Sequence, residues 1–101
     1  MEKFGIYGKL IAKDGEREQL AAILLEAAES LQNLDDCELY LVSVAPEDPN
    51  AVYVYEVWSS EGAHQGSLTL ESTQTLIKRA KPILAGMERI STLVPRGGKG
   101  I

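Results

Sequence analysis

The stretch YVYEVWSSEGAH, residues 53–64, joins an apolar strand to the start of an amphipathic helix. Its β-branched and aromatic residues predict a strand that ends at Trp58, and Ser59 or Ser60 then caps a short helix that runs to about residue 70. Glu56 and Trp58 are two residues apart and therefore share one face of the strand, and His64 follows in the helix. A carboxylate, the single tryptophan and the single histidine of the chain gather at this junction, which predicts the wall of a small-molecule pocket.

Hydrophobic periodicity and turn residues predict the elements on either side of this junction. They are strands at 4–13, 37–45, 51–58 and 87–95, and longer helices at 16–33 and 73–84. Asp14 is expected to cap the first long helix and Gly86 to end the last, while Gly5 and Gly8 indicate a close neighbour beside the first strand. This order is the ferredoxin-like βαββαβ pattern, an α+β fold with both helices on one face of an antiparallel sheet.

The second and third predicted strands are apolar on both faces. Leu39 and Leu41 alternate with Tyr40, and Trp58 and the valines on its face alternate with Tyr53 and other apolar residues. An antiparallel sheet that carries helices on one face normally shows polar residues on the other. The uncovered face therefore needs a partner, most simply a second copy about a two-fold axis. The sequence thus predicts a homodimer in which two sheets face each other, a dimeric α+β barrel.

The composition restricts the function further. With 101 residues we expect a single domain at 1–95 and a mobile tail at 96–101. A formal net charge of -5 disfavours nucleic acid and anionic membrane surfaces as partners. One cysteine, Cys37, excludes an intramolecular disulfide and a multi-cysteine metal cluster. We expect a cytoplasmic location, because no apolar run approaches the roughly 18 residues of a membrane span and the N-terminus lacks the apolar segment of a signal peptide.

Glu56 and Trp58 each have a chemical and a structural interpretation. Burial on an apolar strand face raises the pKa of a carboxyl group, which suits Glu56 to accept the proton of a phenol. Alternatively, Glu56 pairs with a residue of a neighbouring strand or of the second copy, for example with Lys9 or Arg89. Trp58 can stack on a planar ligand while its indole N–H donates a hydrogen bond, or it can anchor the core at the junction.

His64 has several candidate roles: general acid or base, hydrogen-bond donor to a ligand, axial ligand to a haem iron, or a structural side chain. Ser67 lies three residues further along the helix and is its expected neighbour. A single histidine without a supporting second ligand does not indicate a metal site. Tyr53 and Tyr55 point away from Trp58, so we expect them at the dimer interface.

The segments EVWSSE at 56–61, Ala63-His64, Ser67-Leu68 and residues 74–84 resemble the antibiotic biosynthesis monooxygenase family, and within it the quinol monooxygenase branch. The resemblance implies a dimeric α+β barrel. It also implies an enzyme that oxidises a small phenol or quinol with dioxygen and needs no metal, flavin or other cofactor. The alternatives are a non-enzymatic dimer that binds small molecules and a haem-binding or haem-degrading relative.

The resemblance also assigns site residues. Trp58 matches the pocket tryptophan of the family, and Glu56 and His64 match positions that line the same region. We therefore expect His64 and Glu56 to be catalytic, and Trp58, Ser67 and Val54 to bind the substrate. Val54 stands where some polyketide-modifying members carry asparagine, a departure that points away from polyketide substrates.

Overall fold

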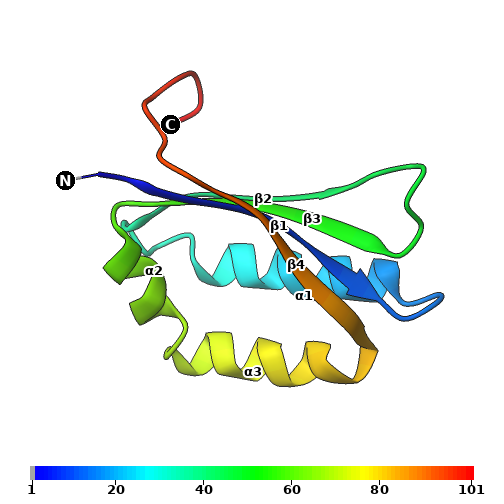
Figure 1. The fold of residues 1–101 in the computed structure, drawn as a ribbon. Coiled ribbons are helices and arrows are strands. Elements are labelled where there is room, and N and C mark those ends of the chain that lie inside the picture. The colour runs from blue at the N-terminus through cyan, green and yellow to red at the C-terminus, as the bar shows by residue number, and fades with distance from the viewer. Residues whose placement is uncertain (1) are drawn as a thin grey trace.

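The computed structural model describes residues 2–101. Its elements in chain order are β1 (Phe4–Ala12), α1 (Arg17–Ser30), β2 (Cys37–Val44), β3 (Ala51–Trp58), α2 (Glu61–Ser67), α3 (Glu71–Ala80), the 3₁₀ turn η1 (Lys81–Ile83) and β4 (Leu84–Leu93). The strands form one antiparallel sheet in the order β2-β3-β1-β4, and α1 and α3 lie on one side of it (Figure 1). The predicted ferredoxin-like α+β fold is confirmed.

One helix ends earlier than predicted, and two predicted helix caps are wrong. Pro82 lies in η1, and its ring cannot continue the helix, so α3 ends at Ala80 rather than near residue 84. Leu84 is already extended and β4 begins there, so Gly86 lies inside a strand and caps nothing. Asp14 does not cap α1 either, because its Oδ1 accepts a hydrogen bond of 2.8 Å from the Asn50 side chain.

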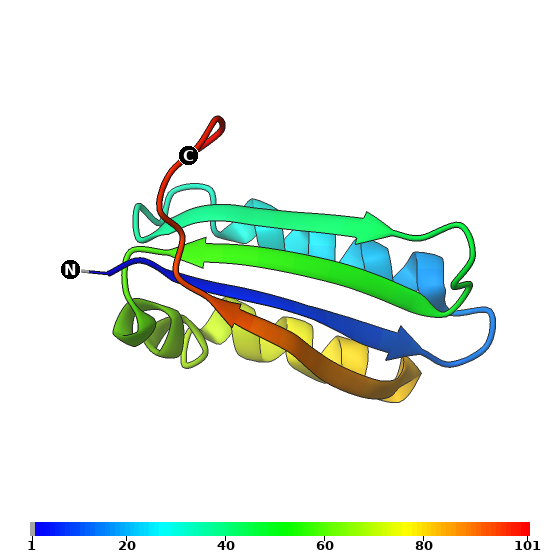
Figure 2. The same ribbon diagram turned by 45° about the horizontal axis from the view of Figure 1, so that its top comes forward.

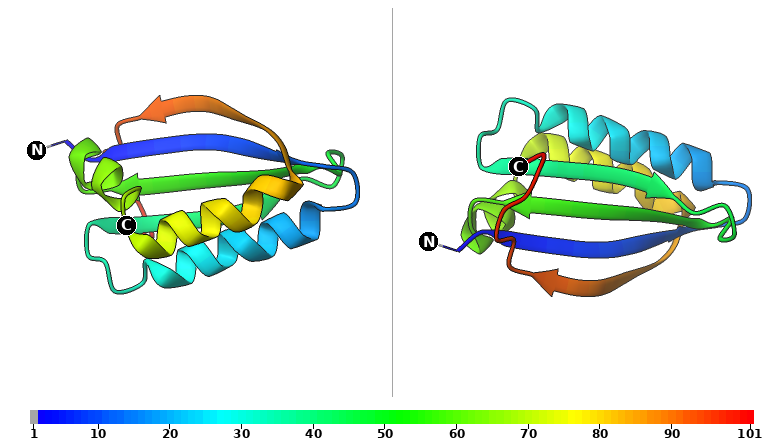
Figure 3. Two further views of the ribbon diagram at one scale, coloured as in Figure 1. Left: turned by 90° about the horizontal axis from the view of Figure 1, so that it is seen from below. Right: turned by 90° about the horizontal axis from the view of Figure 1, so that it is seen from above.

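The hydrophobic core lies between α1 and the sheet. Its buried members come mainly from α1 and β3: Ala12, Leu20, Ile23, Leu24, Val52, Val54 and Ala80. α3 contacts α1 far more than it contacts the sheet, and Figure 1 shows it further from the strands than α1. Seen from the helix side in Figure 3 (left), neither α1 nor α3 covers most of β4, which lies at the edge of the sheet. Residues of α1, α3 and the strands line a cavity between the helices and the sheet.

The close approach predicted at two glycines of β1 is confirmed. A Cβ at Gly8 would lie 2.8 Å from the Glu88 backbone oxygen, at a register shift in the β1–β4 pairing. A Cβ at Gly5 would lie 3.2 Å from Pro95 Cγ. Pro95 belongs to the segment after β4, residues 94–101, which crosses the sheet on the face away from the helices (Figure 2). The mobility expected for residues 96–101 stays a prediction.

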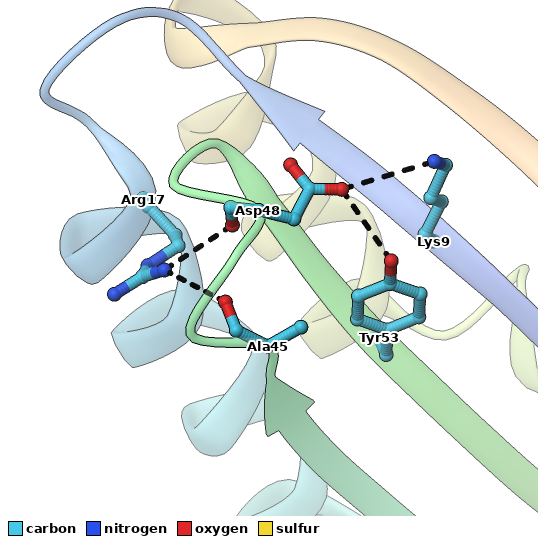
Figure 4. A network of polar contacts seen from close by, with 5 residues as sticks. All are labelled: Lys9, Arg17, Ala45, Asp48 and Tyr53. Carbon is cyan, nitrogen blue, oxygen red and sulfur yellow. Dashed lines mark hydrogen bonds and ion pairs between the residues drawn. The ribbon is translucent and has the colours of Figure 1, made fainter.

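Side chains of α1, β1 and β3 contact the loop between β2 and β3 (Figure 4). The Arg17 guanidinium donates to the backbone oxygens of Ala45, at 3.4 Å, and Asp48, at 3.2 Å. The Asp48 carboxylate accepts a hydrogen bond from the Tyr53 hydroxyl at 3.4 Å and lies 3.9 Å from Lys9 Nζ. These contacts hold the loop against the start of α1. Lys9 lies opposite Tyr53 in the β1–β3 register, on the face of the sheet away from Glu56, so the predicted alternative that these two residues pair is wrong within one protomer.

Within residues 2–101, no helix combines the length and the apolar character that crossing a bilayer requires.

Leu20→Ala is expected to lower the free energy of unfolding by about 2–5 kcal/mol, because the fully buried side chain would leave a cavity under the sheet. Leu25, on the same helix, is 56% exposed, and Leu25→Ala is expected to change stability by less than about 0.5 kcal/mol. Urea unfolding followed by circular dichroism measures both variants. Equal losses would contradict the packing of α1 described above.

Candidate functional site

A cavity of about 450 Å³ lies between the helices and the sheet. All five residues that the sequence singles out as site residues line it: Val54, Glu56, Trp58, His64 and Ser67. The first three alternate along β3 and therefore point to the helix side, while His64 and Ser67 belong to α2, which follows directly after the strand. The fold thus brings the five together on the wall of one cavity.

Glu56 accepts a hydrogen bond at the centre of this end. The Trp58 indole N–H donates to Glu56 Oε1 at 3.0 Å, and His64 Nε2 lies 3.8 Å from the same oxygen. Trp58 is fully buried, and the side chains of Glu56 and His64 are 18% and 11% exposed. The indole N–H is therefore occupied by the protein, which differs from the expectation that it donates to a ligand.

The local structure of α2 fixes the position of His64. Ser60 caps the helix, as expected, with its side chain accepting a hydrogen bond from the Ala63 N–H at 3.1 Å. The ring of His64 packs edge-on against Trp58, with 5.6 Å between ring centroids, and its centroid lies 5.5 Å from that of Phe4. Ser67 donates its hydroxyl to the His64 backbone oxygen at 2.6 Å. That bond commits the Ser67 proton to the helix and leaves its oxygen as an acceptor.

Burial raises the pKa of the Glu56 carboxyl group above its ordinary value. The Trp58 hydrogen bond and the charge interactions with His64 and Arg89 act in the opposite direction. A carboxylate that is desolvated but held by one strong donor is suited to take a proton from a bound hydroxyl group. Of the two partners considered for Glu56, Arg89 acts on it through charge, and Lys9 does not.

Tyr40 is a cavity residue that sequence reasoning missed. It lies directly opposite Glu56 in the β2–β3 register and lines the same cavity. Burial and the negative charge of Glu56 raise the pKa of its hydroxyl group, which therefore keeps its proton and stays a hydrogen-bond donor. Cys37, opposite Trp58, is also protonated, since burial raises the pKa of its thiol to about 11. Alternation along β2 places Tyr40 on a face, but only the register places it beside Glu56.

The rest of the cavity wall is mostly aliphatic and comes from elements far apart in the chain. It includes Leu10 of β1, Leu24 and Ala27 of α1, Leu76, Ile77 and Ala80 of α3, and Leu84 and Met87 of β4. Met87 is 72% exposed and Ile77 is 46% exposed, so both lie at the rim. Across residues 2–101, no group of three or more His, Cys, Asp or Glu side chains is arranged to hold a metal ion.

The opposite face of the sheet carries the tyrosines expected to point away from Trp58. Tyr7 stacks with Tyr53 at 6.3 Å between ring centroids and meets Tyr55 edge-on at 6.4 Å. With Leu41, which is 53% exposed, these residues line a shallow hollow of about 380 Å³. Ser43 and Glu47 add polar groups to the same hollow.

Comparisons with known proteins agree on one family. The family model for antibiotic biosynthesis monooxygenase matches residues 4–79. A protein from Chloroflexus aurantiacus that carries this family name is 38% identical, with a TM-score of 0.85 and coverage of 98% of each chain. No curated protein matches significantly.

More distant solved structures share the fold alone. A Deinococcus radiodurans protein that carries the same family name is 24% identical, with a TM-score of 0.75, over 97% of this chain and 95% of that one. Protein SO0527 from Shewanella oneidensis is 16% identical, with a TM-score of 0.83, over 93% and 91%. The match of the family model over most of the chain, with the 38% identical structure, shows that this protein belongs to the antibiotic biosynthesis monooxygenase family.

Proposed function

We propose that the protein is a monooxygenase that oxidises a small phenol or quinol with dioxygen, without metal or flavin. The observation that carries the proposal is the buried Glu56 carboxylate at the end of an apolar cavity, hydrogen-bonded by Trp58 and close to His64. A desolvated carboxylate beside protonated donors is the arrangement that deprotonation of an aromatic hydroxyl group requires. The family name supports the reaction class, and the site supports the substrate class.

Binding places the aromatic ring in the cavity with its hydroxyl group toward Glu56. Glu56 takes the proton, and the Tyr40 hydroxyl and the His64 imidazole donate hydrogen bonds to the oxyanion that forms. The Trp58 N–H stays on Glu56 and fixes the orientation of the carboxylate. Tyr40 is suited to its role because its raised pKa keeps the phenol protonated beside a negative charge.

The electron-rich oxyanion then reacts with dioxygen. One electron passes from the anion to dioxygen, and the resulting aryloxyl radical and superoxide combine at a ring carbon to give a peroxide anion. This anion takes back the proton held by Glu56 and becomes a hydroperoxide. Loss of water leaves a new carbonyl group, so one oxygen atom enters the product and the other leaves as water. The protein contributes desolvation and anion stabilisation, which make the electron transfer more favourable.

We further propose that the face of the sheet carrying Tyr7, Tyr53 and Tyr55 binds a second copy of the chain. The support is the exposed apolar surface around Leu41 on a sheet whose other side the helices cover. The homodimer then closes a barrel between two sheets. It leaves the site on the helix side of each protomer.

Oxygen uptake with menadiol, corrected for the protein-free rate, is expected to exceed autoxidation. His64→Ala is expected to lower the excess rate at least about 10-fold, because it removes a donor to the oxyanion. Trp58→Phe keeps an aromatic wall but removes the N–H that lowers the pKa of Glu56, so the rise of activity with pH is expected to move to higher pH.

An excess rate of zero for the parent protein would refute the proposal. Binding without turnover would indicate a binding protein, and a haemin Soret shift lost in His64→Ala would indicate a haem protein.

The excess kcat/KM is expected to rise with pH as Glu56 loses its proton, with a midpoint above 4.5, because burial raises this pKa. Glu56→Gln is expected to remove this limb and lower activity about 100-fold or more. Glu29, exposed on α1, provides the matched control Glu29→Gln, for which no change is expected.

Unfolding experiments on Glu56→Gln separate catalysis from structure. A carboxyl whose pKa is raised in the folded state binds more protons there, so the parent loses stability relative to Glu56→Gln as pH rises above 4.5. The variant is therefore expected to be at least as stable as the parent at pH 7. A variant both inactive and strongly destabilised would indicate that Glu56 has a structural role.

Sedimentation at micromolar concentration is expected to show a species of twice 11.0 kDa. Leu41→Glu is expected to weaken this dimer, because it places a charge in the apolar face. Leu25, with nearly the same exposure on α1, provides the control Leu25→Glu, for which the dimer is expected to persist. A stable monomer of the parent protein would contradict this part of the proposal.

A further inference from the structure

The cavity is elongated along the strands. In the sheet register Glu56 is level with Ile6, and Val54, two residues before Glu56 in β3, is level with Gly8. The next level on the helix side brings Leu10 opposite Met87 of β4, and both line the cavity. At a rise of about 3.3 Å per residue, the level of Leu10 and Met87 lies about 13 Å from that of Glu56.

The two ends of the cavity differ in polarity. Tyr40, Glu56, Trp58 and His64 gather at one end. Away from them, the strand side is lined by Val54, Leu10, Leu84 and Met87, and the helix side mainly by aliphatic residues of α1 and α3. We call this part the apolar arm. Of the polar residues that also line this side of the cavity, Ser30 donates its hydroxyl to the Ala27 backbone oxygen, Thr73 lies near the start of α3, and Lys81 is exposed at the rim.

The apolar arm has an open mouth with apolar sides. Met87 and Ile77 are 72% and 46% exposed although both are large and apolar. Methionine is unbranched and adapts to differently shaped ligands, which suits a mouth that guides a flexible chain. Water in the arm would find few hydrogen-bond partners, whereas a hydrocarbon chain would bury its surface there.

We propose that the substrate is a phenol or quinol with an apolar side chain, of the alkyl or isoprenoid type. Its ring lies beside Glu56 and Trp58, and its chain lies in the apolar arm and leaves past Met87. This inference rests on the proposed function for the position of the ring, and it adds the side chain to the substrate class. A compact phenol fills only the polar end, so the chain supplies the greater part of the binding free energy.

Binding of a series of 4-n-alkylphenols tests the inference. Titrations without dioxygen follow the fluorescence of Trp58, the single tryptophan of the chain, and isothermal calorimetry confirms the Kd values. The Kd is expected to fall about threefold to fourfold for each added methylene group, and then to level off once the chain passes Met87. A Kd that does not depend on chain length, or that rises with it, would overturn the inference.

Variants of the arm show whether the chain binds there. Met87→Lys puts a charge at the mouth and is expected to weaken long-chain phenols at least about 10-fold while leaving 4-methylphenol unchanged. Ile90, exposed on β4 and outside the cavity wall, provides the control Ile90→Lys, for which the whole series is expected to bind as to the parent. Equal weakening in both variants would indicate non-specific binding and overturn the inference.

A second variant fills the arm from inside. Ala80→Leu is expected to shorten the chain length at which Kd levels off, whereas Ala22→Leu on the exposed side of α1 leaves it unchanged. Because Ala80 is buried, the folding of this variant is checked by circular dichroism, and Met87→Lys at the exposed rim provides the test if Ala80→Leu does not fold.

The two proposals fail separately. A protein that shows the chain-length dependence but no oxygen uptake would refute the monooxygenase alone. A protein that oxidises menadiol but binds every alkylphenol equally would refute the apolar side chain alone.

Discussion

The packing of α3 against α1, rather than against the sheet, is the constraint on which the site depends. α1 fills the space under β3 with Leu20, Ile23 and Leu24, and Ala80 of α3 joins the same core from the side. A second helix packed as tightly on the sheet would close the space beneath it. Because α3 stands away from the strands, the aliphatic side chains around the cavity lack partner atoms on one side, which leaves dispersion energy for a ligand to recover.

The carboxylate of Glu56, at the polar end of the cavity, has a hydrogen-bond donor and a histidine close to it. A carboxylate in an apolar site is costly unless it is hydrogen-bonded or paired. The Trp58 N–H supplies the hydrogen bond and His64 lies 3.8 Å away, yet burial still outweighs them and raises the pKa of Glu56. The cost of burying the charge leaves a carboxylate able to accept a proton. The proposed chemistry therefore uses a group whose ionisation lowers the stability of the fold.

Family membership and site geometry carry different information. The family model and the 38% identical structure show what the chain belongs to, whereas a fold of this kind can host unrelated activities. The proposed substrate class rests on the lining of the cavity. Of this lining, the polar end comes mainly from residues 56–67, which are close in sequence, and the apolar arm comes from five separate elements.

Local sequence was sufficient wherever neighbours along the chain decide the structure. The bounds of β3, the Ser60 cap and the shared face of Val54, Glu56 and Trp58 were all predictable, because strand alternation and capping act within a few residues. The end of α3 at Ala80, rather than near residue 84, follows from Pro82, which lies in the 3₁₀ turn before β4 begins at Leu84. Asp14 is a residue type that commonly caps helices, but its carboxylate instead accepts a hydrogen bond from the side chain of Asn50, which lies in a distant loop.

Three features were decided by the tertiary structure: Tyr40 lies opposite Glu56, Leu10 lies opposite Met87, and α3 packs against α1 rather than against the sheet. Alternation tells which face of a strand a residue occupies, but it does not tell which residue of the next strand lies opposite. That register follows from how whole strands pair, and the depth of the cavity follows from how whole helices pack. The amino-acid sequence thus determined the chemistry available at the junction, and long-range packing determined the shape of the space in which that chemistry can act.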